Sequence, residues 1–156
     1  HSNPMKYTER KMHGPMRVYF DKVGVVESPP FDVDAWLTKI EARLTELPVV
    51  FEIFQVEVLK ELKRANPIDA LGYYHNLTLA PLLELLHIKY KPIHYNYKTR
   101  YTYYDLPAEA AARLESLYFV KDAAELCKKH EEAGRWFWKV LEETNIVEVK
   151  KNLQQS

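Results

Sequence analysis

The stretch from Leu77 to Ile88 constrains the fold more than any other part of the chain. It is rich in leucine, and at helical spacing its apolar side chains cover nearly the whole circumference. Because other elements must cover such a helix on every side, the sequence predicts a central, buried helix. This helix is expected to run from Ile68 to about Tyr90, with Pro81 kinking it.

Helical periodicity continues through most of the chain after residue 30. Further helices are expected at about 32–47, 49–64, 107–118 and 123–144. Pro48 separates the first two and suits the first turn of the second. The early β-branched residues of the second would also suit a strand, but its length favours a helix. The fold class is therefore mainly α, an up-and-down bundle of about five helices with a short N-terminal β-hairpin.

The chain divides into four segments. Residues 1–4 resemble a tag remnant and are left out of the fold argument. Residues 5–30 contain a predicted β-hairpin at 16–27, which would need further strands or a helical surface, since an isolated hairpin is only marginally stable in water. Residues 31–144 are expected to form the helical bundle, and residues 145–156 a polar tail.

Composition disfavours several classes of function. The 22 Lys and Arg residues balance 22 Asp and Glu residues, whereas dedicated nucleic-acid binders usually carry a basic excess. No stretch approaches the ~20 apolar residues of a membrane span, and no secretory signal opens the sequence. A single cysteine, Cys127, excludes an internal disulfide and favours the cytoplasm. Only 4 glycines are present, which disfavours a glycine-rich phosphate loop.

Two ionisable side chains interrupt the apolar central helix. Glu84 and His87 are three residues apart and therefore share a face. A carboxylate in an apolar bundle must be paired, or its pKa rises, so Glu84 is either a general base or the partner of an Arg or Lys from the next segment. A di-metal carboxylate site would need a second Glu-x-x-His, which the sequence lacks. Asp32 and Asp34 have the spacing of a Mg²⁺ pair, but a helix N-cap is the preferred interpretation.

The segment from His87 to Tyr104 contains four basic residues, six tyrosines and no acid. Positive charge among aromatic side chains suits a ligand with a phosphate and a stacked ring, and Lys98 and Arg100 are the candidate phosphate contacts. Beside Glu84, such a loop would form a ligand pocket. The alternative is a tyrosine-rich loop that packs on the bundle while its lysines stay solvated. A third interpretation, RNA binding, predicts affinity that falls steeply with salt.

Five short motifs form a wider pattern over about half of the chain. They are LLELLHIKY (82–90), RY (100–101), YDLP (104–107), YFVKD (118–122) and WF (136–137). In these motifs the chain resembles the helical C-terminal part of bacterial and archaeal nucleotidyltransferase-like proteins, relatives of the antibiotic nucleotidyltransferases. The resemblance implies a domain that completes the acceptor-substrate pocket, and a homodimer.

In such proteins an N-terminal α/β domain carries a Gly-Ser motif and a paired-Asp strand, which hold the metal and the nucleotide phosphates. This sequence has no Gly-Ser pair, and Asp32-Val33-Asp34 has no strand ahead of it. The chain alone is therefore expected not to transfer nucleotides and to hold no cofactor. It is either a fragment whose catalytic half is missing or a stand-alone domain. Mg²⁺ and a nucleoside triphosphate are implied only for an intact parent enzyme.

The resemblance also implies roles for individual residues. In an intact enzyme Glu84 would assist deprotonation of the acceptor hydroxyl. Contacts to a small-molecule substrate or nucleotide are expected from seven residues, His87, Tyr97, Lys98, Arg100, Tyr101, Tyr104 and Asp105. The rival interpretation is a helical protein–protein interaction or dimerisation module without catalytic activity.

Overall fold

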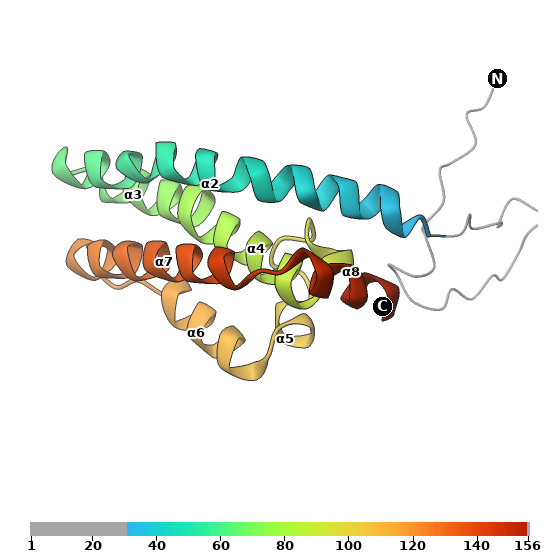
Figure 1. Cartoon of the computed structure of the whole chain (residues 1–156). Coiled ribbons are helices and arrows are strands. Elements are labelled where there is room, and N and C mark those ends of the chain that lie inside the picture. Colours follow the sequence, from blue (N-terminus) through green and yellow to red (C-terminus); the bar gives the residue numbers. More distant parts are fainter. Residues whose placement is uncertain (1–30, 156) are drawn as a thin grey trace, which may run out of the picture.

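The computed structural model describes residues 31–155, which form a mainly helical bundle (Figure 1). Its helices are α2 (Val33–Lys63), α3 (Pro67–Tyr73), η1 (Tyr74–Leu79), α4 (Ala80–Tyr90), η2 (Pro92–His94), α5 (Thr102–Asp105), α6 (Ala108–Tyr118), α7 (Ala123–Glu143) and α8 (Ile146–Gln155). Between residues 31 and 155 there is no β-strand. The expected tag remnant at 1–4 and hairpin within 5–30 lie outside the described residues. No helix between residues 31 and 155 has the length and apolar character needed to cross a membrane.

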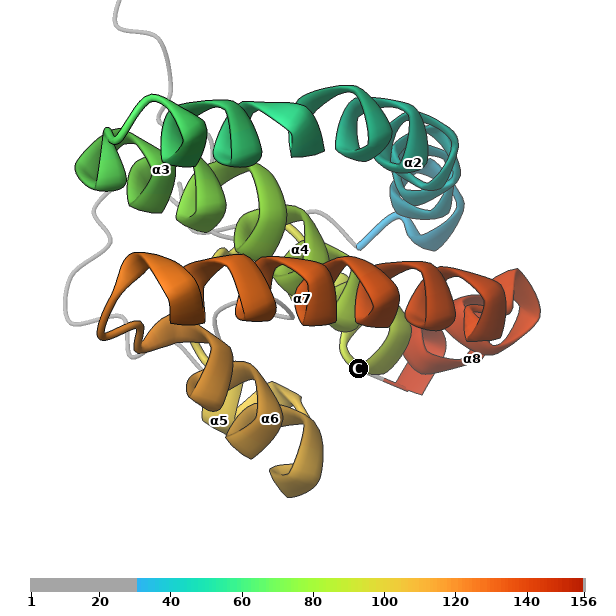
Figure 2. The same cartoon turned by 90° about the vertical axis from the view of Figure 1, so that its left-hand side faces the viewer.

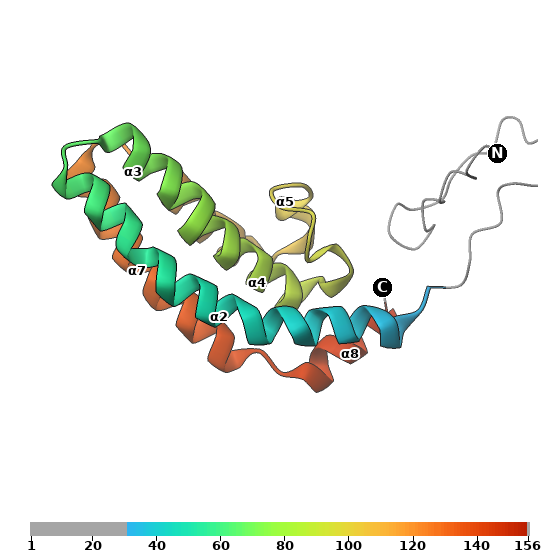
Figure 3. The same cartoon turned by 90° about the horizontal axis from the view of Figure 1, so that it is seen from above.

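The long helix α2 contains Pro48, where the sequence predicted a boundary between two helices. That prediction is wrong. A proline removes one helical hydrogen bond and crowds the preceding turn, and Figure 3 shows α2 changing direction near its middle. The helix nevertheless continues, because Leu47, Phe51 and Val58 on both sides of the proline are buried in the same core. Tertiary packing therefore outweighs the local cost of the proline.

Both ends of α2 are capped. Asp32 accepts a hydrogen bond of 2.9 Å from a backbone amide of the first turn, which confirms the N-cap interpretation of this residue. At the other end, the amide of Asn66 donates to the carbonyl of Glu61 (2.9 Å) and the amide of Ala65 donates to that of Leu62 (3.1 Å). This pair of bonds is a Schellman motif. Ala65 has a φ of 60°, in the left-handed region that usually selects glycine.

The predicted central helix is present as α3, η1 and α4 in direct succession. Figure 3 shows these three elements running beside α2. The leucines and the isoleucine of α4 are fully or almost fully buried, as expected for a central helix: Leu82, Leu83, Leu85, Leu86 and Ile88. The prediction that this helix forms the middle of the core is confirmed.

Pro81 is accommodated by the π-helical turn η1, which lies immediately before α4. Having no N–H, Pro81 cannot donate to the carbonyl of Leu77 four residues earlier. That carbonyl instead accepts a hydrogen bond of 3.0 Å from Nε2 of Gln55 on α2. Oε1 of the same Gln55 side chain accepts in turn from the hydroxyl of the buried Thr78 (2.9 Å). A side chain of α2 thus replaces the missing backbone donor of the central helix.

The main helices alternate in direction along the chain, as in an up-and-down bundle (Figures 1 and 2). Helices α6 and α7 form where the sequence predicted them, and Asp122 caps α7 by accepting from a backbone amide at 2.8 Å. The core joins α2 to α7 through Phe51 and Phe137, whose rings stack at 3.8 Å.

The segment from 145 to 156, expected as a polar tail, contains helix α8. This helix contacts α2 and α4, and it buries Val149 and Leu153. The two residues are four positions apart, so they lie on one face of the helix. An apolar stripe this short is a weak sequence signal. It is nevertheless sufficient to attach α8 to the bundle, because the other helices already form a larger core on which it packs.

Candidate functional site

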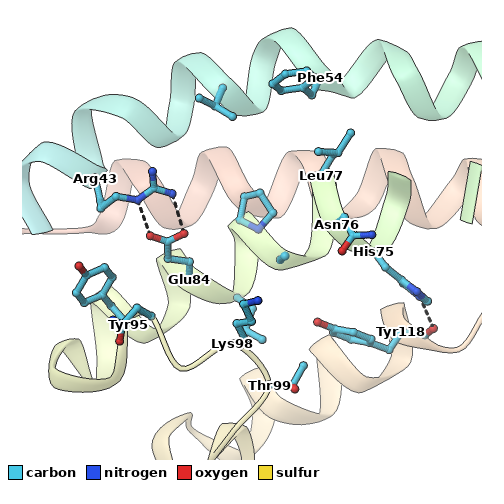
Figure 4. Close-up of a pocket in the computed structure, with 15 residues that line it drawn as sticks. Arg43, Phe54, His75, Asn76, Leu77, Glu84, Tyr95, Lys98, Thr99 and Tyr118 are labelled. Atoms are coloured by element: carbon cyan, nitrogen blue, oxygen red, sulfur yellow. Dashed lines mark hydrogen bonds and ion pairs between the residues drawn. The ribbon is translucent and has the colours of Figure 1, made fainter. Parts of the chain in front are cut away.

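A groove of about 760 Å³ opens beside the central helix (Figure 4). Three segments and the end of α6 line it. Helix α2 contributes Arg43, Val50 and Phe54. The central helix contributes His75, Asn76 and Glu84 among others, and the segment after it contributes Tyr95, Lys98 and Thr99. Tyr118 at the end of α6 completes the lining. We refer to this hollow as the groove.

Glu84 forms a two-point ion pair with Arg43 at one end of the groove. Arg43 Nε lies 2.7 Å from Glu84 Oε1, and its Nη2 lies 2.9 Å from Oε2. A second carboxylate, Glu46, takes the remaining nitrogen at 2.6 Å. The hydrogen bonds to Glu84 raise the pKa of Arg43 above its ordinary value, although burial opposes this. Glu84 was expected to be either a general base or one half of an ion pair. The structure contains the ion-pair partner, which is Arg43.

The sequence did not identify Arg43, because the partner comes from the preceding helix and not from the next segment. A signal was available in the spacing of α2. Arg43, Leu47 and Val50 follow one another at intervals of four and three residues, so they share a helix face. A cation on an otherwise apolar face is the expected match for an inward-facing carboxylate.

Tyr95 lies next to this ion pair and anchors the loop that follows α4. Its ring meets Trp36 of α2 edge-on at 5.4 Å, and Trp36 Nε1 donates to the carbonyl of Pro92 at 3.1 Å. Burial raises the pKa of Tyr95, and the charge of Glu84 raises it further. Its hydroxyl therefore stays protonated beside Glu84.

The opposite end of the groove is held by contacts between η1 and α6. The buried hydroxyl of Tyr74 donates to the carbonyl of Leu117 at 2.9 Å. His75 stacks on Tyr118 with ring centroids 5.6 Å apart, and its Nε2 lies 3.3 Å from the Tyr118 carbonyl. Burial raises the pKa of Tyr118, so its hydroxyl remains a hydrogen-bond donor. Figure 4 shows this hydroxyl turned into the groove, towards the side that holds Lys98.

Lys98 is the predicted basic residue that reaches the groove. No acidic side chain between residues 31 and 155 lies within ion-pair distance of its ammonium group, which Figure 4 shows turned towards the central helix. Its backbone has a φ of 56°, a left-handed conformation that costs ~1–2 kcal/mol for a non-glycine residue. The other basic residues of the segment do not line the groove: Lys89 pairs with Glu143 at 2.7 Å, and Arg100 lies over the ring of Tyr101.

His87 and Asp105 do not line the groove, and their side chains are buried in the bundle. His87 is fully buried, and its Nε2 is 3.7 Å from Oδ2 of Asp105, beyond hydrogen-bond distance. Neither ring nitrogen of His87 has a hydrogen-bond partner among the described residues. Oδ2 of Asp105 lies 2.8 Å from Nδ1 of His94. Burial lowers the pKa of His87, so this imidazole is neutral in the folded protein.

The predicted tyrosines also lie away from the groove lining. Tyr97 and Tyr101 stack on His94, with centroids at 4.5 and 5.5 Å, while Tyr104 is 90% exposed. The structure thus brings Glu84 and Lys98 to one hollow and places the other six predicted residues elsewhere. It adds several residues that the sequence did not single out for binding: Arg43, His75, Asn76, Tyr95, Thr99 and Tyr118.

Metal binding finds no support in this part of the chain. Between residues 31 and 155, no three His, Cys, Asp or Glu side chains are arranged to hold a metal ion. Comparisons with protein-family models, with curated proteins and with solved structures find no match to this chain. A functional interpretation therefore rests on the groove and on the charges around it.

Proposed function

We propose that the groove binds a small-molecule substrate that carries an anionic group next to a ring. The chain would then act as the helical, substrate-binding domain of a nucleotidyltransferase-like protein. The observation that supports this proposal is the ammonium group of Lys98, which lies over a groove with an apolar floor and has no acidic side chain of residues 31–155 within ion-pair distance. A cation held in a strained backbone conformation is typical of a functional position.

The groove offers complementary surfaces to such a ligand. Lys98 and the hydroxyl of Tyr118 can donate to an anion from two sides. Phe54, Pro81 and Leu83 provide apolar surface on which a ring can lie. Arg43 is not free to bind the anion, because Glu84 and Glu46 already neutralise it.

Glu84 is proposed to hold Arg43 in place. With both of its oxygens bound to one guanidinium, it can accept a proton only if the pair opens. The Glu84→Gln variant separates the two roles in an intact parent protein. Unchanged turnover with lower stability supports the paired role, whereas lost turnover with an altered pH profile at unchanged stability supports a general base.

The Mg²⁺ ion implied for an intact parent enzyme does not fit the groove as it stands. Within the part of the chain that the structure describes, Glu84 is the one acidic residue of the lining, and Arg43 occupies both of its carboxylate oxygens. A divalent cation needs free oxygen ligands. We therefore propose that the chain supplies substrate contacts, and that metal-dependent transfer belongs to a part that this sequence does not contain.

Calorimetric titration of the full chain with phenyl phosphate and with adenosine monophosphate tests the proposal. We expect both to bind and the Lys98→Gln variant to weaken binding at least about fivefold, because it loses a charge-assisted contact. Lys128→Gln, at an exposed position of α7, is the matched control and should leave the affinity unchanged. Absence of binding by both compounds, or equal effects of the two variants, would refute the proposal. Measurable nucleotide transfer from Mg·ATP by the chain alone would contradict its assignment as a substrate-binding part.

One observation favours the second candidate, a protein-interaction or dimerisation module. Val49, Ile53 and Val56 follow at helical spacing on α2, and all three are more than half exposed. A homodimer formed through this stripe should dissociate on an Ile53→Lys substitution. Sedimentation equilibrium over a range of concentrations provides the measurement, and a monomer at all concentrations would rule this candidate out for self-association.

A further inference from the structure

A second hollow of about 450 Å³ adjoins the groove. It lies between the central helix, the segment around residues 99–103 and helix α6. We refer to it as the apolar pocket. Four residues line both hollows: His75, Leu83, Thr99 and Tyr118. The two hollows are therefore neighbours, separated by no more than these four side chains, two of which are the stacked rings of His75 and Tyr118.

The apolar pocket has a buried floor and an exposed aromatic rim. Leu83, Ala111 and Leu114 form the floor and are at most 5% exposed. Phe119 and Tyr103 form the rim, where they remain 73% and 69% exposed. Large aromatic side chains left in water around an apolar hollow are typical of a binding site. A ligand that covers them gains free energy in proportion to the apolar area removed from water.

The two hollows differ in the sign of the charge that lines them. Lys98 lies in the groove, and among residues 31–155 Glu115 is the one Asp, Glu, Lys or Arg that lines the apolar pocket. Glu115 accepts a hydrogen bond of 2.9 Å from the hydroxyl of Tyr103. A second anionic group in the apolar pocket would face this carboxylate, so the part of the ligand that lies there must be uncharged.

We propose that the natural ligand of the groove is an elongated amphipathic molecule, with an anionic end at Lys98 and an uncharged alkyl or aryl tail in the apolar pocket. This inference rests on the proposed function, because the anionic end occupies the groove. It adds the class of ligand: an aryl or alkyl phosphate, or another anion with a hydrophobic tail, in place of a compact polar substrate. The tail of such a ligand would contact the residues that both hollows share, among them Thr99 and the His75–Tyr118 stack.

Two ligands with the same head separate the inference from the proposed function. Phenyl phosphate reaches only the groove, whereas 4-butylphenyl phosphate adds four carbons that can enter the apolar pocket. Since each buried CH₂ improves affinity about fourfold, we expect the butyl compound to bind the full chain at least about tenfold more tightly. Titration calorimetry below the aggregation concentration of the butyl compound gives both affinities.

A pair of phenylalanine variants locates the tail. Phe119→Ala removes a rim residue of the apolar pocket, and Phe54→Ala removes a residue that lines only the groove. Both side chains are exposed, so neither change should unfold the protein, which circular dichroism can verify. We expect Phe119→Ala to reduce the advantage of the butyl compound several-fold and to leave phenyl phosphate unaffected. Phe54→Ala should weaken both compounds by a similar factor.

The outcomes are distinguishable. If neither compound binds, the proposed function fails, and the inference fails with it. If both bind with equal affinity, or if Phe119→Ala leaves the butyl advantage intact, only the inference is overturned. Nuclear Overhauser contacts between the butyl protons and the methyl groups of Leu114 would support it directly, and contacts confined to residues of α2 would overturn it.

Discussion

Replacing Gln55 by leucine should lower the free energy of unfolding by about 0.5–1.5 kcal/mol, the net contribution of one hydrogen bond, here at a partly buried site. Gln55 Nε2 is the donor to the Leu77 carbonyl (3.0 Å), which Pro81 cannot serve. Leucine is similar in size to glutamine, so no large cavity adds to the loss. Thr78 keeps a neighbour, since its hydroxyl also lies 3.1 Å from Nδ1 of His130. The expected cost is therefore mainly that of the orphaned carbonyl.

A double-mutant cycle tests the physical reason and not merely the loss of stability. Pro81→Ala supplies a backbone N–H that can serve the central helix in place of the side chain of α2. In that background, Gln55→Leu should cost about 1 kcal/mol less than in the parent chain, because the two changes share one acceptor. An additive cycle would show that Gln55 does not replace the hydrogen bond lost at Pro81.

Urea unfolding followed by far-ultraviolet circular dichroism measures all four corners of the cycle. The slope against urea concentration should be the same for the four proteins, which ensures that the change is in stability and not in the denatured state. Gln154→Leu, at an exposed position of α8, is the control and should change stability by less than about 0.5 kcal/mol. A cost of Gln55→Leu within this range would refute the reasoning.

Three further predictions use the same unfolding assay. Ala65→Gly should stabilise the protein by about 0.5–1 kcal/mol, because residue 65 has a left-handed backbone, whereas Ala112→Gly inside α6 should destabilise it by about 1 kcal/mol. The pKa of His87 is lowered by burial, so the unfolded chain binds a proton first and stability falls as the pH drops below about 6.5. His87→Leu should reduce the slope of unfolding free energy against pH between pH 6.5 and 5 by up to ~1.4 kcal/mol per pH unit. An unchanged slope would show that His87 does not cause the loss of stability. Arg43→Leu should lower the free energy of unfolding more than the double change Arg43→Leu with Glu84→Leu, since the single change leaves a half-buried carboxylate unpaired. A larger loss in the double variant would show that the unpaired carboxylate is not the cause of the destabilisation.

Much of the helical framework could be predicted from local patterns. The all-round apolar run at 77–88, the capping residues Asp32 and Asp122, and the amphipathic stripes of α6 and α7 each specify their element within a few turns of chain. The need of Glu84 for a cation was also predictable, since an inward-facing carboxylate is costly without one. The identity of its partner was not, because Arg43 lies 41 residues earlier on another helix.

The predictions that failed share one cause. Pro48 is a local signal for a helix boundary, and the polar sequence after residue 144 is a local signal for a tail. In the structure, Leu47 and Phe51 hold α2 together across the proline, and Val149 and Leu153 attach α8 to the bundle. Burial against a core formed elsewhere in the chain outweighs both signals.

The sequence alone determined a mainly helical protein with a buried central helix, because periodicity and capping act within one or two helical turns. Only the tertiary structure decided which polar groups meet. It placed Lys98 with Glu84 at one groove, moved His87 and Asp105 into the interior, and joined the groove to an apolar pocket. The reason is that a hollow is lined by residues from several helices, whose relative positions depend on long-range packing of the core and not on any local pattern.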